Sequence, residues 1–363
     1  MFIRMELFAP KNVLLWSILW LLAVGNLAEN ESCVYCVPID ECGKLFGILQ
    51  QGKSAPFEDI RLLYQSGCND YRGLFCCGSD PKGLEELELQ KPHCGVAESI
   101  SVGSHYIING EEVKLSTRPW MALFLTNSSA NGQHFCGGSL ITQRFVLSAA
   151  HCFTKPEYND LNSVVVRLGE HDVRRARDCR TYWGKEICAS PSEDFAIKRI
   201  ISHEFFSLST NYHDIALVEL ASRVDYKTHI KPICMPLDVE VQQLAETLDT
   251  FSVAGWGKLN AYAARGSDVL MATDVRRSSR KMCTIKYSMW VKESQICAGS
   301  SASTHDSCHG DSGGPLGSLV NYFGRPRFFQ FGLVSFGNRD CQSEAVYTNV
   351  GAHLPWITEN IAG

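Results

Sequence analysis

The segment Gly310-Asp311-Ser312-Gly313-Gly314-Pro315 places a serine among glycines in the carboxyl-terminal part of the chain. Glycine adopts backbone angles that other residues avoid, so a serine with such neighbours can lie on a tight turn with its hydroxyl accessible. On such a turn the backbone N–H groups of Gly310 and Ser312 can bind an oxyanion. The segment therefore predicts that Ser312 is a nucleophile and that Gly310 and Ser312 form its oxyanion hole.

A hydroxyl alone is a poor nucleophile, because it needs an imidazole as general base and a carboxylate that holds the imidazole in one tautomer. The candidates are His151, in Ser148-Ala149-Ala150-His151-Cys152, and Asp214, in His213-Asp214-Ile215-Ala216-Leu217. Singly, each residue has an ordinary explanation: a serine in a turn, a satisfied histidine and an aspartate that caps a strand. Together, in the order His, Asp, Ser, they predict a catalytic triad of His151, Asp214 and Ser312.

At these residues the sequence resembles the chymotrypsin-like (S1) serine proteases, and the resemblance covers Ile107 to Gly363. It is also carried by Ile107-Ile108-Asn109-Gly110, Phe135-Cys136-Gly137-Gly138-Ser139-Leu140, Gly255-Trp256-Gly257 and Val346-Tyr347-Thr348-Asn349-Val350. The resemblance implies a serine endopeptidase. It also implies an all-β fold of two antiparallel six-stranded β-barrels with a carboxyl-terminal helix.

The hydrophobic pattern from Trp120 onward agrees with this fold class. Short apolar or alternating runs are separated by turn residues, without intervening amphipathic helices, and this pattern favours antiparallel barrels. The runs are WMALFL (120–125), SVVVRL (163–168), DIALVEL (214–220), FSVAGW (251–256), FFQFGLVSF (328–336) and AVYTNV (345–350). In this part of the chain only residues 352–360 have a helical pattern.

The cysteine content and the amino terminus both favour secretion. Sixteen cysteines, an even number that permits eight disulfides, are far too many for a reducing cytosol. Residues 13–24 (VLLWSILWLLAV) predict a signal peptide over residues 1–28, with its end between residues 25 and 28. A membrane anchor is the alternative, but these twelve apolar residues are well short of the roughly 20 that span a bilayer. We expect a secreted, extracellular protein that does not bind a membrane.

Several other functions are not supported by the composition. The net charge of −5 gives no basic face of the kind that binds nucleic acid. The histidines show neither an H-E-x-x-H motif nor a paired ligand spacing, so no transition-metal site and no required cofactor is predicted. In a secreted chain, Asn30 and Asn127 lie in N-x-S sequons and are candidate glycosylation sites.

Six cysteines within residues 33–77 define a small amino-terminal module with the spacing C-x2-C-x5-C-x25-C-x7-C-C. A module of this length depends on disulfides to fold, and the sequence alone leaves their connectivity open. The spacing resembles the clip domain that precedes such proteases in arthropods, and an unrelated secreted cystine scaffold is the alternative. The pairing of the clip family implies Cys33–Cys76, Cys36–Cys68 and Cys42–Cys77.

Residues 78–106 connect this module to the protease domain, 107–363. Their first part, 78–93 (GSDPKGLEELELQKPH), is polar and contains Pro and Gly, which predicts a linker ahead of the activation segment. The protease resemblance implies Cys94–Cys234, a disulfide that would hold the amino-terminal chain to the protease after cleavage. It further implies Cys136–Cys152, Cys283–Cys297 and Cys308–Cys341. Cys179 and Cys188 remain, and a loop bridge between them resembles a subgroup of clip proteases with active catalytic domains.

The loop that contains this bridge offers the carboxylates of Glu170, Asp172, Asp178 and Glu186, which are oxygen donors of the type that calcium prefers. In related proteases this loop sometimes binds calcium, so calcium is the one cofactor considered for this chain. Solvated acidic residues are the alternative, because the spacing of these four residues is not diagnostic of a calcium site.

Asp306, six residues before Ser312, matches the floor of the family's primary specificity pocket. A carboxylate there favours a substrate Arg or Lys through charge-assisted hydrogen bonds, and the Ser307 hydroxyl can assist. The residues that would form the pocket wall are Ser335, Gly337 and Ala345. Ala345 departs from the family, in which trypsin-like enzymes usually have glycine, and we expect its methyl group to narrow the pocket. A chymotrypsin-like preference is the alternative, which Asp306 disfavours.

In this family, cleavage of the inactive zymogen frees an α-amino group that orders the oxyanion hole. Here the new ammonium group of Ile107 would pair with Asp311. Such a buried pair suits a two-state switch, because either charge alone is costly. The bond follows Tyr106 instead of Arg or Lys, so we expect no self-activation and an activating protease of aromatic or large apolar preference. Processing at another bond is the alternative.

The two resemblances together imply a clip-domain serine protease in an extracellular cascade, such as those that control Toll signalling or melanisation. The expected partners are an upstream activating protease, a downstream zymogen or cytokine precursor, and a serpin inhibitor. A noncatalytic clip-protease homologue that acts as a cascade adaptor is the alternative, and the intact triad argues against it.

Overall fold

The computed structural model describes residues 36–68, 74–96, 111–126, 133–182, 184–259, 262–299, 310–338 and 343–362. All of them belong to one unit, Val34–Gly363. Several predicted features lie outside the described residues: the signal peptide, Asn30, Asn127, Tyr106, Ile107, Asp306, Ser307, Cys33, Cys308 and Cys341.

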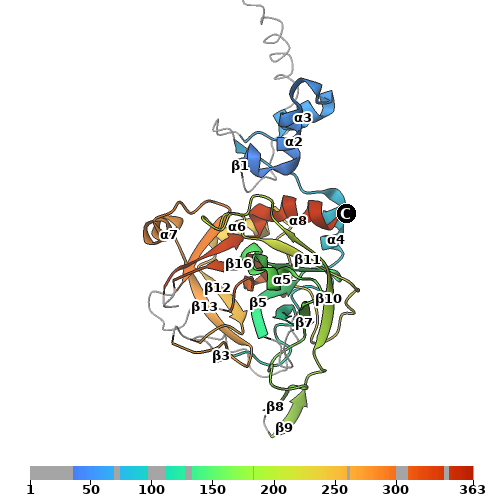
Figure 1. The fold of residues 1–363 in the computed structure, drawn as a ribbon, viewed down its shortest axis with the longest axis vertical. Helices are drawn as coiled ribbons and strands as arrows, with labels where there is room; N and C mark the ends of the chain where they lie inside the picture. Colours follow the sequence, from blue (N-terminus) through green and yellow to red (C-terminus); the bar gives the residue numbers. More distant parts are fainter. Residues whose placement is uncertain are drawn as a thin grey trace, which may run out of the picture. The chain divides into compact units, whose positions relative to one another are not determined.

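Six antiparallel strands close the first barrel in the order β10-β11-β6-β5-β4-β7. Figure 1 labels four of them, β5, β7, β10 and β11. The bounds are β4 (Met121–Thr126), β5 (Gln133–Leu140), β6 (Phe145–Ser148), β7 (Val164–Leu168), β10 (Glu193–Ser202) and β11 (Ala216–Leu220). In β7, fully buried residues alternate with half-buried ones, which is the two-residue period of a strand with one face on a core. Phe124, Val146 and Val218 have no exposed surface and fill the interior.

The second barrel has the order β12-β15-β16-β17-β14-β13, and pairing of β12 with β13 closes it. Its bounds are β12 (Thr250–Gly255), β13 (Met271–Ser278), β14 (Gln295–Gly299), β15 (Pro315–Tyr322), β16 (Arg325–Phe336) and β17 (Ala345–Asn349). A short strand, β3 (Glu111–Glu112), adds to β13. The predicted fold class, two six-stranded antiparallel barrels, is therefore confirmed.

Helices are more frequent after Trp120 than the sequence pattern indicated. The carboxyl-terminal helix α8 (Leu354–Ile361) forms close to its expected place, after the short η4 (Gly351–His353). The expectation that it would be the only helix here was wrong, because the chain also forms η3 (Ala150–Phe153), α5 (Pro156–Asn159), α6 (Val239–Thr247) and α7 (Arg280–Tyr287). No helix within the described ranges is long and apolar enough to cross a membrane.

The amino-terminal module has a small core of its own. Its elements are β1 (Val37–Pro38), η1 (Ile39–Glu41), α2 (Gly43–Gln51), η2 (Gly52–Ser54), α3 (Phe57–Gln65) and β2 (Leu74–Phe75). Leu45 and Ile48 of α2 are buried against Val37 and Ala55. Two of the implied disulfides, Cys36–Cys68 and Cys42–Cys77, are present and staple these short elements together.

The segment expected to be a linker contains a helix, α4 (Pro81–Glu88), that packs on the protease domain. Asp80 caps it by accepting hydrogen bonds from the backbone N–H groups of Lys82 and Gly83, and Pro81 occupies its first turn. Leu87 is buried in the protease core. The helix α4 packs beside α8 (Figure 1). The described part of this segment is therefore an ordered connection.

Four disulfides implied for the protease domain and its connection are present: Cys94–Cys234, Cys136–Cys152, Cys179–Cys188 and Cys283–Cys297. The Cys179–Cys188 bridge joins opposite residues of a hairpin made of β8 (Cys179–Tyr182) and β9 (Lys185–Cys188).

Candidate active site

The first barrel brings His151 and Asp214 together. His151 lies in η3, just after β6, and Asp214 lies two residues before β11. These strands pair antiparallel with Ser148 opposite Ala216, so the two segments leave the barrel side by side. His151 Nδ1 is 2.7 Å from Asp214 Oδ2, and the backbone N–H of His151 donates to Asp214 Oδ1 at 2.9 Å. The carboxylate thus holds both the ring and the backbone of the histidine.

Two hydroxyl groups of the second barrel fix Asp214 from the other side. The Ser335 hydroxyl donates to Asp214 Oδ2 at 2.5 Å, and the Thr348 hydroxyl donates to the Asp214 backbone carbonyl at 2.8 Å. The Asp214 side chain has no exposed surface. The sequence assigned Ser335 to the pocket wall and did not single out Thr348 for this role, because both contacts cross from one barrel to the other.

The environment of His151 favours its protonated form. Burial by itself would lower the pKa of His151, but the charge of Asp214 and the hydrogen bond to it outweigh that effect and raise the pKa above its usual value. The Nδ1 contact with Asp214 leaves Nε2 as the nitrogen that can accept a proton from a nucleophile. The side chain of His151 remains 23% exposed, so its ring is accessible to a substrate.

Ser312 lies on a turn that only glycine neighbours permit. Gly310 and Gly313 have φ angles of 107° and 77°, in the region that other residues avoid. A Cβ atom on Gly313 would lie 2.2 Å from Ser148 Oγ. The turn is held beside η3, since the Ser312 carbonyl accepts the N–H of Gly137 at 2.8 Å and is 3.8 Å from Cys152 Sγ.

Asp311 lies against the segment Gly255-Trp256-Gly257. The backbone N–H of Gly257 donates to Asp311 Oδ1 at 2.8 Å. A Cβ atom on Gly255 would approach the same oxygen to 2.2 Å, and one on Gly257 would approach the carboxyl carbon to 2.5 Å. Both glycines are therefore required by the space that the Asp311 carboxylate occupies.

In the described part of the predicted pocket wall, Ala345 lies close to Gly337. Ala345 is buried at the start of β17, and a Cβ atom on Gly337 would be 3.2 Å from the Ala345 methyl carbon. The methyl group of Ala345 therefore lies close to Gly337. A glycine at position 345 would leave the space of this methyl group empty. Ser335, the third residue assigned to the wall, directs its hydroxyl toward Asp214.

The acidic loop residues divide into two groups. The buried Asp172 carboxylate accepts hydrogen bonds from Arg174 at 2.8 and 2.9 Å, and Arg175 and Arg180 lie within 4 Å, so it is already neutralised. Burial raises the pKa values of the Glu170 and Asp178 carboxyl groups. Repulsion by the charge of Asp178 raises the pKa of Glu170 further. Asp178 Oδ1 is buried and has no hydrogen-bond partner in the part of the chain that the structure describes. Asp178 therefore has a carboxylate oxygen available for a bound cation. Glu170 already accepts hydrogen bonds from the backbone N–H of His171 and from Ser192, and it lies 3.4 Å from Arg167 Nη1, while the exposed Glu186 does not join them.

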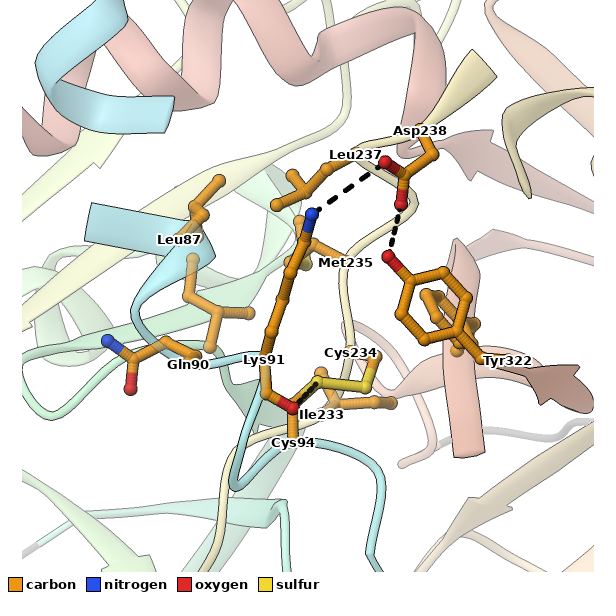
Figure 2. Close-up of a pocket in the computed structure, with 12 residues that line it drawn as sticks. Leu87, Gln90, Lys91, Cys94, Ile233, Cys234, Met235, Leu237, Asp238 and Tyr322 are labelled. Carbon is orange, nitrogen blue, oxygen red and sulfur yellow. Dashed lines mark hydrogen bonds and ion pairs between the residues drawn. A yellow bond between two sulfur atoms is a disulfide. The ribbon is translucent and has the colours of Figure 1, made fainter. Parts of the chain in front are cut away.

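The disulfide between Cys94 and Cys234 lines a small pocket beneath α4 (Figure 2). On one side of it, Lys91 Nζ is 3.7 Å from Asp238, and the Tyr322 hydroxyl donates to the same carboxylate at 2.6 Å. The segment that ends at Cys94 is thus attached to the protease domain by a covalent bond and by polar contacts.

Comparisons with known proteins agree with this geometry. Residues 107–357 match the trypsin family, and residues 30–77 match the regulatory CLIP domain of proteinases. Serine protease grass of Drosophila melanogaster is 35% identical over 343 residues, which cover 90% of this chain and 88% of that protein. Phenoloxidase-activating factor 3 of Holotrichia diomphalia is 34% identical over 355 residues, or 93% and 96% of the two chains. The crystal structure of the Drosophila Grass clip serine protease of the Toll pathway matches with a TM-score of 0.68 and 33% identity, over 90% of this chain and 94% of that one.

Proposed function

Because this chain belongs to the clip-domain serine proteases of the trypsin family, we propose that it is an active endopeptidase that uses His151, Asp214 and Ser312 as its catalytic triad. The observation that carries the proposal is the pair of hydrogen bonds from His151 to the buried Asp214 carboxylate. A histidine held in this way is oriented and polarised as a general base for a neighbouring hydroxyl.

In the proposed mechanism, Asp214 accepts the Nδ1–H of His151 and leaves Nε2 free of a proton. Nε2 takes the proton of Ser312 Oγ as that oxygen attacks the scissile carbonyl carbon. The backbone N–H groups of Gly310 and Ser312 stabilise the oxyanion that forms. His151 then gives the proton to the leaving amine, and water, activated in the same way, hydrolyses the acyl-enzyme.

The proposed substrates have Arg or Lys on the amino side of the scissile bond. Asp306 supports this by its place six residues before Ser312, since a carboxylate in a dry pocket binds a guanidinium or ammonium group strongly. The Ala345 methyl group narrows the proposed specificity pocket, so Ala345→Gly should raise kcat on Arg and Lys peptides. Faster cleavage after Phe than after Arg would contradict the assignment of Asp306.

The protein is proposed to be a zymogen that is activated by cleavage before Ile107. The close fit of Asp311 against Gly255 and Gly257 supports this role, because a carboxylate held beside the Ser312 turn can transmit the arrival of a cation to that turn. Tyr106 precedes the bond, so the proposed activator is a protease of aromatic or large apolar preference.

The proposed setting is an extracellular proteolytic cascade, in which the secreted enzyme cleaves a downstream zymogen or cytokine precursor and is stopped by a serpin. The support is the naming of its relatives, which include a protease of the Toll pathway and a phenoloxidase-activating factor. Sequencing the amino termini of the processed protein from its native fluid tests the setting, and an uncleaved chain there would contradict it.

A labelling experiment tests the catalytic proposal. After activation, a fluorophosphonate reagent should label the protein at Ser312, and Ser312→Ala should lose both labelling and peptide hydrolysis while it is secreted normally. A noncatalytic adaptor would remain unlabelled after correct cleavage before Ile107.

We also propose calcium as a stabilising ligand of the loop that contains Glu170 and Asp178. Both carboxylates are buried, and together they would give a cation two of the oxygen ligands that calcium requires. Calcium should raise the unfolding temperature of the wild-type protein and should have little effect on Asp178→Asn. An equal shift in both proteins would place calcium elsewhere.

A further inference from the structure

Three buried histidines meet behind Asp214 although they come from separate segments. His203 follows β10, His213 directly precedes Asp214, and His353 ends η4. Their exposed fractions are 5%, 6% and 3%. One ring nitrogen from each lies within 4.8 Å of those of the other two, which is a spacing that a single metal ion can bridge after small side-chain movements.

The hydrogen bonds of His353 leave one of its nitrogens suited to bind a metal. Its Nδ1 is 2.7 Å from the Asn349 carbonyl oxygen, which can only accept, so the proton of the neutral ring is on Nδ1. Nε2 therefore has a free electron pair, and it faces His213 Nδ1 at 3.3 Å. A backbone carbonyl behind a ligating imidazole is the usual outer partner in metal sites.

His213 has a carboxylate behind it. Its Nε2 is 3.6 Å from Glu41 Oε1, in the amino-terminal module, and Lys292 Nζ donates to the same oxygen at 2.5 Å. Burial by itself would raise the pKa of Glu41, but hydrogen bonds and charges of His213 and Lys292 lower it to about 2. Glu41 is thus an ionised carboxylate beside His213 Nε2, and Nδ1 is the nitrogen of His213 that faces His353.

The separation of these two nitrogens fits a metal as well as a hydrogen bond. Two imidazole nitrogens on one tetrahedral zinc lie about 3.3 Å apart, because each Zn–N bond is about 2.0–2.1 Å. Without metal, His213 Nδ1–H donates to His353 Nε2. When a metal binds, it takes the place of the Nδ1 proton of His213. The neutral His213 ring then carries its proton on Nε2, beside the Glu41 carboxylate.

His203 would supply the third nitrogen with a local change of hydrogen bonding. Its Nδ1 accepts the backbone N–H of Phe205 at 3.2 Å and lies 3.7 Å from Glu204 Oε2. Coordination through Nε2 requires Nδ1 to carry the proton instead and to donate it to Glu204. This arrangement would match the carboxylate–histidine–metal order that a metal bound to His213 Nδ1 would create with Glu41.

We infer that His203, His213 and His353 form a binding site for a divalent transition metal, with Zn²⁺ as the expected occupant, and that Glu41 is a positioning residue for His213. Neutral imidazoles bind zinc and copper in preference to calcium or magnesium.

The experiment uses the full secreted chain with its disulfides intact, without a histidine tag and in calcium-free buffer. Titration with Zn²⁺ against a fluorescent zinc indicator should show one high-affinity equivalent. His353→Gln should weaken binding by more than about 100-fold. Glu41→Gln, which removes only the outer partner, should weaken it by about 10–100-fold.

His229→Gln is the matched control, because His229 is also buried but lies outside the three-histidine cluster. Its Nε2 is within hydrogen-bonding distance of the Pro191 carbonyl oxygen, at 3.1 Å. It should retain wild-type zinc affinity. The visible spectrum of the Co²⁺-substituted wild-type protein needs no variant and should be that of a tetrahedral site with nitrogen ligands. Zinc binding that is unchanged in His353→Gln, an octahedral Co²⁺ spectrum, or no binding at all would overturn the inference.

Discussion

At the scale of single residues, Asp214 is the most constrained group of the candidate active site. It accepts hydrogen bonds from the backbone and ring of His151 and from the Ser335 hydroxyl, and Thr348 holds its backbone carbonyl. Hydrogen bonds to a charged group contribute about 1.5–3 kcal/mol each, so these donors hold the carboxylate firmly in one orientation. Its position is therefore set before any substrate binds.

Asp214→Asn tests this arrangement through the pH dependence of the activated enzyme. In the wild type, kcat/KM should fall as the pH drops through the raised pKa of His151, because protonated His151 cannot accept the Ser312 proton. Without the carboxylate that pKa decreases, so the acidic limb should move to lower pH. The plateau should also fall by about 10⁴-fold, because an amide supports the wrong tautomer.

Asp225→Asn is the control for that experiment, because Asp225 is exposed. Asp225→Asn should leave unchanged both the plateau value of kcat/KM and the pH at which kcat/KM falls on the acidic side. An acidic limb that stays in place in Asp214→Asn would mean that His151 does not govern the rate.

Sequence patterns predicted the site residues that are recognised by their neighbours along the chain, and they missed those that depend on contacts across the fold. His151, Asp214 and Ser312 have distinctive flanks and a distinctive order. The role of Thr348 and the second contact of Ser335 arise only when β17 and β16 of the second barrel reach Asp214. The three-histidine cluster escaped for the same reason, since its members share no local spacing.

At the scale of elements, α4 shows how a polar segment can be ordered by its packing. Asp80 N–H donates to the Thr358 hydroxyl at 2.8 Å, and Leu87 is 3% exposed. The segment is polar and contains Pro and Gly, which predicted a linker, although Asp80-Pro81 is a helix-start signal. For α7, the cap at Ser279 and the left-handed Ser288 similarly define a short helix that periodicity did not indicate. The barrel strands were predicted because their alternation follows directly from burial of one face.

Gly83→Ala should separate α4 from α8. A Cβ atom at Gly83 would lie 1.9 Å from the Thr358 carbonyl oxygen, so the helix must move and the protein should lose about 1–3 kcal/mol of stability. Thermal unfolding of the intact chain measures the loss.

Gly47→Ala is the matched control in another helix. Nothing lies within 4 Å of a Cβ atom at Gly47 in α2, so alanine should stabilise that helix by about 0.5–1 kcal/mol. Equal and small effects of both substitutions would mean that α4 does not pack on α8 in solution.

At the scale of the whole molecule, the proposed switch depends on which protease cuts the chain. A chymotrypsin-like protease should cleave the purified zymogen before Ile107, and trypsin should do so poorly. Tyr106→Arg should reverse this order and allow activation by trypsin, because only the residue before the bond has changed. Mass spectrometry of the new amino terminus and peptide hydrolysis measure the outcome, and an active native form that begins elsewhere would contradict the switch.

The Cys94–Cys234 disulfide has a consequence for the cleaved protein. The amino-terminal module would remain attached as an intramolecular ligand, and a short tether gives an effective concentration in the millimolar range. Individually weak contacts, such as the hydrogen bond between Lys292 and Glu41, would then persist however far the enzyme is diluted. Reduction of this one bond would convert the same contacts into a bimolecular equilibrium, in which the module is lost as soon as the protein is diluted.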